Sequence, residues 1–188
     1  VGFDPWLLTV EEIESLERTL EGSGVNLARI LENPVDGIWP DQPGAPRGRV
    51  FVHPDRLAGE SHGDKRSRLA DGLRKDGHRA AVLTLPDSLC WLLNIRGADV
   101  PKNPVVHGFA VLHDDGRADL YADPAKFGAP ERAHLGAEVT LSDPASLADA
   151  LRALSGPVRL DKGSAPLAVA DILRDAGIEI SWGDDPCK

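Results

Sequence analysis

The side chains best suited to chemistry lie in one short polar stretch, from Asn94 to Asn103. It contains a guanidinium, Arg96, and a carboxylate, Asp99, three residues apart. An arginine can bind a carboxylate through two parallel hydrogen bonds, so this stretch is suited to hold a peptide terminus or a neighbouring subunit. Alternatively, Arg96 and Asp99 pair with each other or cap the backbone of their own loop, as polar loop residues commonly do. The sequence leaves both interpretations open.

Apolar residues on both sides predict how this polar stretch is positioned. A buried strand is expected over residues 80–85, and a second strand-like run covers residues 107–113. Trp91 and the two leucines after it form an apolar plug directly before the polar residues. Because such anchors fix a loop and leave its polar groups free, we expect the stretch to face a substrate or a partner.

No catalytic or metal-binding constellation is recognisable elsewhere in the sequence. The histidines show no HExxH or HxH spacing, and Ser88 lacks the G-x-S-x-G context of a hydrolase nucleophile. No glycine-rich phosphate loop follows a strand. The six histidines are His53, His62, His78, His107, His113 and His134. The sequence therefore predicts no catalytic residue, no metal ligand and no bound cofactor in this chain.

Two pairs of adjacent aspartates need a separate explanation. Asp114 and Asp115 precede a glycine and fit a tight turn. Asp184 and Asp185 are suited to contribute to a larger metal site, but a solvated pair of carboxylates is the simpler expectation.

Composition limits the class of protein. A chain of 188 residues is long enough for one domain, or for one domain and part of another. Its net charge of −9 argues against nucleic acids and anionic membranes as partners, because both require a basic surface. Cys90 and Cys187 lack the spacing of a metal site or a disulfide framework, so we expect Cys90 in the core and a reducing, cytoplasmic setting. The absence of methionine and the sequences of the two ends suggest a piece of a longer protein.

The first 48 residues predict a helix, a short strand and a linker. Thr9 and Glu12 form a T-x-x-E capping box before an apolar helical pattern that ends near Gly22. A short strand is expected over residues 28–31. Residues 42–48 are rich in proline and glycine, so we place a domain boundary at residue 48.

Residues 49–188 predict strands that alternate with helices. Gly116 fits the turn of a hairpin, and the apolar run after Arg79 is typical of a strand covered on both faces. Helices are expected over residues 61–76, 124–135, 144–154 and 164–176, and strands over residues 50–53, 79–85, 109–112, 118–122, 139–141, 158–161 and 179–182. This order predicts an α/β fold, a mixed β-sheet with helices on its faces. Trp6 and Trp39 are expected to be packing anchors.

Several motifs resemble those of the cytosolic-type Xaa-Pro aminopeptidases (aminopeptidase P). Asn33-Pro-Val-Asp36 with Ile38-Trp39 is similar to their N-x-V-D-x-I-W element. Residues 91–99, with Asn103-Pro104, resemble their W-L-x-N-x-R-G-S-D…N-P signature, although Ala98 stands where the family usually has serine. Matching residues in the same order are Phe3 to Trp6, Gly59 to Ser61 and Lys65. The resemblance covers nearly the whole chain.

The resemblance implies a domain organisation. Members of the family carry two creatinase-type N-terminal domains before a catalytic domain of the pita-bread fold. Residues 1–48 would be the end of the first domain plus a linker, and residues 49–188 the second domain. The catalytic domain would begin after Lys188. The family's metal ligands lie in that domain, so the resemblance implies none in this chain.

The resemblance also implies a function for the parent protein. It would be a cytoplasmic, homodimeric metallopeptidase that uses two divalent ions, expected to be manganese, to remove the first residue from peptides with proline second. A metal-activated water would attack the scissile carbonyl. This segment would narrow access to the catalytic cleft and help to form the dimer. We expect the cleft rim or dimer contact at Asn94, Arg96, Asp99 and Asn103.

Two rival hypotheses belong to other classes. The chain is then either a free-standing, non-catalytic binding module with a creatinase-like fold, or a small independent hydrolase built on Asp184, Asp185 and a histidine. Sequence beyond Lys188 distinguishes the first from our interpretation, and metal binding by the isolated chain distinguishes the second.

Overall fold

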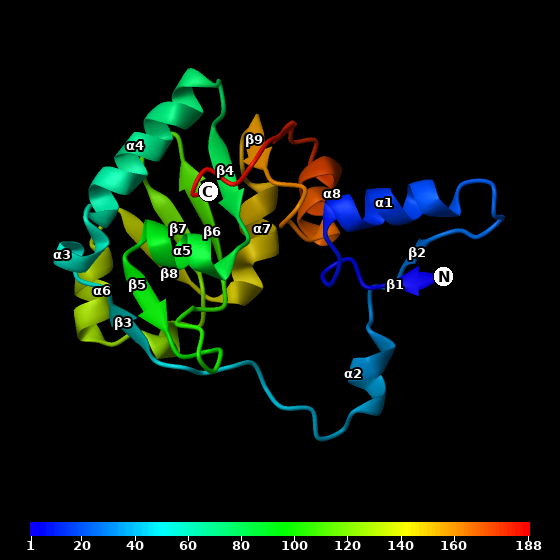
Figure 1. The fold of residues 1–188 in the computed structure, drawn as a ribbon, viewed down its shortest axis with the longest axis horizontal. Helices are drawn as coiled ribbons and strands as arrows, with labels where there is room; N and C mark the ends of the chain where they lie inside the picture. Colours follow the sequence, from blue (N-terminus) through cyan, green and yellow to red (C-terminus); the bar gives the residue numbers. More distant parts are fainter.

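The computed structural model describes residues 1–188 and has a six-stranded mixed sheet at its centre (Figure 1). The strands are β4 (Ala80–Leu83), β6 (Phe109–His113), β7 (Ala118–Tyr121), β8 (Val139–Ser142), β9 (Val158–Leu160) and β10 (Ile180–Trp182), in the spatial order β10-β9-β4-β6-β7-β8. β6 is antiparallel to both its neighbours, β4 and β7, whereas every other pair in the sheet is parallel. The predicted α/β fold with a mixed sheet is confirmed.

The two faces of this sheet carry separate apolar cores. Successive side chains of a strand point to opposite faces, so Ala81 and Leu83 join one core while Ala80 and Val82 join the other. The first core is covered by α4 (His62–Lys75), α5 (Pro86–Leu92) and α6 (Ala129–Leu135), and the second by α1 (Val10–Leu20), α7 (Leu147–Arg152) and α8 (Leu167–Asp175). The predicted burial of the central strand on both faces is therefore confirmed.

The predicted helix starts are present as hydrogen bonds. Thr9 Oγ1 accepts from the Glu12 amide at 3.2 Å, and Glu12 Oε2 accepts from the Thr9 amide at 2.7 Å, which completes the capping box of α1. Ser61 Oγ accepts from the Asp64 amide at 3.1 Å at the start of α4. The helix expected over residues 124–135 is divided into a 3₁₀ turn, Pro124–Lys126, and α6, because Phe127 adopts an extended conformation. Another 3₁₀ turn, Pro144–Ser146, leads directly into α7.

The structure differs from the prediction around the polar stretch. The apolar plug belongs to α5, which begins at Pro86 and has Asp87 in its first turn, both favourable at a helix start. Arg96 lies on a strand, β5 (Ile95–Gly97), which pairs antiparallel with β3 (Val50–Val52). The polar residues are thus held on a two-stranded ribbon beside the main sheet.

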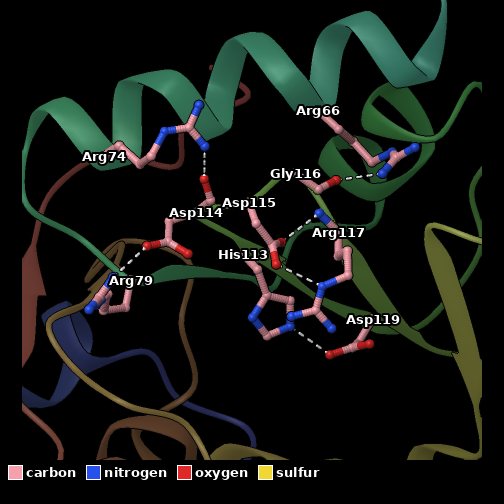
Figure 2. A network of polar contacts seen from close by, with 9 residues as sticks. All are labelled: Arg66, Arg74, Arg79, His113, Asp114, Asp115, Gly116, Arg117 and Asp119. Atoms are coloured by element: carbon pink, nitrogen blue, oxygen red, sulfur yellow. Dashed lines mark hydrogen bonds and ion pairs between the residues drawn. The ribbon is translucent and has the colours of Figure 1, made fainter.

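Charged side chains attach α4 to the turn between β6 and β7 (Figure 2). Arg66 and Arg74, on the helix, donate to the backbone carbonyls of Gly116 and Asp114. Gly116 has a φ of +88°, which confirms the predicted hairpin turn. Asp114 pairs with Arg79 at 3.1 Å, and Asp115 Oδ1 accepts from the backbone amide of Arg117 at 3.0 Å. These aspartates serve the turn, as the sequence predicts.

Residues 1–40 form a smaller unit beside the main sheet. β1 (Gly2–Phe3) pairs in parallel with β2 (Ala28–Arg29), and α1 packs against α8. α2 (Pro34–Ile38) stands away from the body, on a stretch that leads to β3, whereas α3 (Asp55–Ala58) lies next to α4 (Figure 1). Trp6 packs edge-on against Phe109 at 6.1 Å between ring centroids, as expected of an anchor, although it is 43% exposed. Trp39 is similarly exposed, at 46%, and has no aromatic partner, so its predicted packing role is not supported within this chain.

Candidate functional site

Asn94 is a buried structural residue. It adopts a left-handed conformation, with φ of +49°, at the junction of α5 and β5. Its amide nitrogen donates to Asp55 Oδ1 at 2.9 Å and to the Glu60 carbonyl at 2.8 Å, while its Oδ1 accepts from Lys65 Nζ at 2.7 Å. Asn94 therefore ties α3 and α4 to the start of β5.

Lys65 completes this buried arrangement. Its ammonium also donates to the Trp91 carbonyl at 2.9 Å and lies 4.3 Å from the centre of the Trp91 ring. Burial lowers the pKa of Lys65, although the nearby Glu60 carboxylate acts in the opposite direction. Lys65 therefore supports α5 from within the buried layer.

Asp99 is the second buried member of the predicted set. Its Oδ2 accepts from Lys126 Nζ and from the His107 amide, each at 2.7 Å, and its Oδ1 accepts from the Gly48 amide at 2.9 Å. Burial alone would raise the pKa of Asp99, but the Lys126 ammonium and the two amide donors hold it below its ordinary value. Of the two alternatives for this residue, backbone capping is present and pairing with Arg96 is not.

Arg96 is the free cation of the set. Its Nη1 donates to the carbonyls of Cys90, at 3.1 Å, and Ile95, at 2.7 Å, which fixes the guanidinium plane. Its Nε and Nη2 have no hydrogen-bond partner, and no carboxylate pairs with it. One side of the guanidinium is thus anchored and the other is available to a carboxylate or a carbonyl oxygen.

Arg96 and Asn103 line one groove of about 410 Å³. Trp91, Ser88 and the C-terminal Cys187 and Lys188 also line it. The Asn103 side chain makes no hydrogen bond within the chain, and the residue is exposed. The structure therefore divides the four predicted residues into two groups, because Arg96 and Asn103 are accessible while Asn94 and Asp99 are buried.

Sequence spacing did not reveal the partners of these residues. Lys126, the cation of Asp99, lies 27 positions away, and Lys65 lies 29 positions from Asn94. Cys187 reaches the groove from the end of the chain. None of these pairs has a local sequence signal, since each depends on how β3, β5 and the main sheet pack together.

Of the two adjacent C-terminal aspartates, only Asp185 has a hydrogen-bonded carboxylate. Asp185 is buried, so the expectation of a solvated pair is wrong for it, whereas Asp184 is exposed. Asp185 Oδ1 accepts from the Cys187 amide at 2.8 Å, and its own amide donates to Asp161 Oδ2 at 3.2 Å. No group of three or more His, Cys, Asp or Glu side chains is arranged to hold a metal ion.

No helix is both long and apolar enough to cross a bilayer.

Comparison with known proteins places the chain among peptidase domains. Residues 41–188 match the family described as Creatinase/Prolidase N-terminal domain. The probable Xaa-Pro aminopeptidase P of Neosartorya fischeri is 37% identical over 164 residues, which cover 87% of this chain and 25% of that protein. The probable Xaa-Pro aminopeptidase P of Paracoccidioides lutzii is 38% identical over 155 residues, covering 82% of this chain and 25% of that protein.

Solved structures agree with this placement. X-prolyl aminopeptidase from Caenorhabditis elegans, described as a cytosolic enzyme with a di-nuclear active site, superimposes with a TM-score of 0.87 and 25% identity over 99% of this chain and 31% of its own. The N-terminal domain of cytoplasmic peptidase PepQ from Mycobacterium tuberculosis shares the fold, with a TM-score of 0.50 and 13% identity over 66% of this chain and 96% of its own. The chain spans about a quarter of the length of the curated relatives it matches. It belongs to the creatinase/prolidase N-terminal domain family.

Proposed function

We propose that this chain is a non-catalytic N-terminal region of an Xaa-Pro aminopeptidase. The full-length parent removes the N-terminal residue from peptides that have proline in the second position. The observation that carries this proposal is the superposition on the Caenorhabditis elegans X-prolyl aminopeptidase, which extends over 99% of the chain. It includes residues 1–40, which lie outside the matched creatinase/prolidase region, so the likeness extends beyond a single shared domain.

We propose the same domain division that the sequence motifs suggest. Residues 1–48 form the end of a first creatinase-like domain and a linker, and residues 49–188 form a second. Supporting this, β1 and β2 are a two-stranded parallel pair, whereas parallel strands normally belong to larger sheets covered by helices. The second half of α1 is also uncovered, since Leu16 is exposed and only Val10 and Ile13 of that helix are buried.

The chemistry of the parent belongs to a part of the protein outside this chain. Two divalent metal ions, which we expect to be manganese, would be held there and would supply Lewis-acid activation of a water molecule. The residues of this chain do not fit such a centre, because no three potential ligands come together. This region acts instead by shape and contact, at the rim of the catalytic cleft and in a homodimer. Arg96 and Asn103 are the members of the predicted set with accessible groups for that role.

The decisive experiment assays the parent protein and this chain in parallel. The full-length protein, supplied with manganese, is expected to release the first residue from peptides with proline second. It should not cleave matched peptides with alanine second. The isolated chain is expected to be inactive under the same conditions. Hydrolysis by the isolated chain would contradict the proposal at once.

One alternative remains a candidate, a stand-alone creatinase-like binding module. Finding a catalytic domain encoded after Lys188 would contradict the binding-module alternative. An independent hydrolase built on Asp184 and Asp185 requires tight, stoichiometric metal binding, which titration of the isolated chain with manganese measures. The burial of Asp185 and the absence of any cluster of three potential ligands argue against that use.

A further inference from the structure

The segment from Leu31 to Trp39, which we call the apolar arm, exposes large apolar side chains that this chain covers only in part. Leu31 is 88% exposed, Val35 51%, Ile38 80% and Trp39 46%. Val35 and Ile38 are spaced i, i+3, so they share one side of α2, and Trp39 follows directly as its C-cap residue. No residue of α2 is buried. A contiguous set of this kind marks an interaction surface, because isolated apolar residues are common on surfaces but clustered ones are not.

The arm nevertheless has an ordered local structure. Asn33 Oδ1 accepts from the Val35 amide at 3.0 Å at the start of α2, and Asn33 Nδ2 donates to Asp4 Oδ2 at 3.1 Å. Gln42 Nε2 donates to Asp36 Oδ1 at 2.9 Å at its other end. These contacts shape a five-residue helix that stands off the body (Figure 1). A helix this short has little intrinsic stability, so a packed partner is the expected source of its order.

Charge argues against a second copy of this chain as that partner. Residues 30–46 include Glu32, Asp36 and Asp41 and contain no lysine or arginine. A symmetric contact between two arms would bring these like charges together. A surface that complements the arm would therefore be apolar at its centre and basic at its edge.

We infer that the apolar arm docks on the remainder of the parent polypeptide, which lies outside these 188 residues. This inference rests on the proposed function, since it requires the longer chain of an aminopeptidase. In the Caenorhabditis elegans enzyme the same fold, arm included, is embedded in a chain of which this segment covers 31%. The arm then fixes the position of residues 49–188 relative to the rest of that protein, and Ile38 and Trp39 are its central contacts.

Oxidative footprinting with hydroxyl radicals tests the inference through Trp39. Its oxidation rate is measured in the full-length parent and in the 188-residue chain at the same radical dose. We expect about fivefold slower oxidation in the parent, because burial removes most solvent contact from a half-exposed side chain. Equal rates in the two proteins would overturn the inference. The short chain is also measured at increasing protein concentration. If Trp39 oxidation slows there while a dimer appears by mass, the arm contacts a second copy of the chain, and the inference is overturned.

Two exposed substitutions separate docking from folding. Ile38→Ser changes the arm, and Leu57→Ser removes an equally apolar, exposed side chain from α3. Neither is expected to alter the unfolding midpoint of the short chain. In the parent, Ile38→Ser should restore Trp39 oxidation to the rate of the short chain, whereas Leu57→Ser should leave it slow. An unaltered Trp39 rate in the Ile38→Ser parent would contradict docking. Peptidase activity of the parent is measured separately. If the parent protects Trp39 but does not cleave proline peptides, only the proposed function is contradicted.

Discussion

Lys126 Nζ lies 2.7 Å from Asp99 Oδ2, and the two side chains are 5% and 0% exposed. This buried ion pair links the 3₁₀ turn at Pro124–Lys126 to the loop after β5. Asp99 Oδ1 also accepts a hydrogen bond from the Gly48 amide. One carboxylate therefore connects the end of the linker, the loop after β5 and the 3₁₀ turn that contains Lys126. The pair organises the base on which Arg96 and Asn103 are presented.

Removing either partner of this pair should destabilise the fold strongly. Asp99→Asn or Lys126→Met leaves one charge buried without its counterion, which costs about 3 to 5 kcal/mol of unfolding free energy. Urea denaturation at neutral pH measures the loss. The double variant should lose less than the sum of the two single losses, because it buries no unpaired charge. Additive losses would show that the two residues do not act as a pair.

Arg66 should matter more than Arg74, although both donate from α4 to the β6–β7 turn (Figure 2). Arg66 is buried, and Arg66→Met leaves the Gly116 carbonyl without its charged donor, at a cost of about 1.5 to 3 kcal/mol. Arg74 is half-exposed, so Arg74→Met should cost less than about 1 kcal/mol. Denaturation of the two variants side by side checks the order. Equal losses would contradict this ranking.

Local signals in the sequence account for much of the fold. The capping residues Thr9 and Ser61 locate the starts of two helices, and Gly116 locates the hairpin. The unbroken apolar run of β4 predicts a strand buried on both faces. These features succeed because each depends on residues within a few positions of one another.

The site is less predictable because its geometry depends on distant contacts. α5 was not predicted, since Trp91 and its leucine neighbours resemble a loop anchor as much as a helix face; Pro86 and Asp87 were the available signal. The burial of Asn94 and Asp99 follows from Lys65 and Lys126, which approach only after the layers pack. Sequence alone gave no means to separate these two residues from Arg96 and Asn103.

Acid should weaken the β6–β7 hairpin through Asp119. His113 Nε2 lies 2.7 Å from Asp119 Oδ2, and this contact lowers the pKa of Asp119 below its ordinary value. A carboxyl with a lowered pKa in the folded state contributes stability above its unfolded pKa and loses it as pH falls through the folded pKa. The difference in unfolding free energy between wild type and Asp119→Asn should therefore shrink as the pH falls below about 4. Urea titrations across this range at fixed ionic strength test the trend, and a difference that grows as pH falls would contradict it.

Both thiols should react slowly in the folded chain. Burial raises the pKa of Cys90, and burial together with the Asp185 carboxylate raises the pKa of Cys187. Little thiolate is then present at pH 8, so iodoacetamide should modify each cysteine at least about tenfold more slowly than in the urea-unfolded chain. Mass spectrometry after timed labelling measures both rates. Rapid labelling of Cys90 in the native chain would contradict its place in the core.

Arg96 should affect the parent enzyme without being needed for the fold of this chain. Arg96 lines the groove and its Nε and Nη2 have no hydrogen-bond partner, so Arg96→Ala removes a donor pair that a peptide carboxyl or a partner subunit can use. We expect about a tenfold loss in kcat/KM for proline peptides, equivalent to about 1.4 kcal/mol, or a shift of the dimer toward monomer. Arg96→Lys should recover only part of the effect, because an ammonium lacks the planar fork. Arg56→Ala, an exposed arginine on α3 without a hydrogen-bond partner, is the matched control. Unchanged peptide turnover together with an unchanged oligomeric state would remove Arg96 from both the cleft rim and the dimer contact.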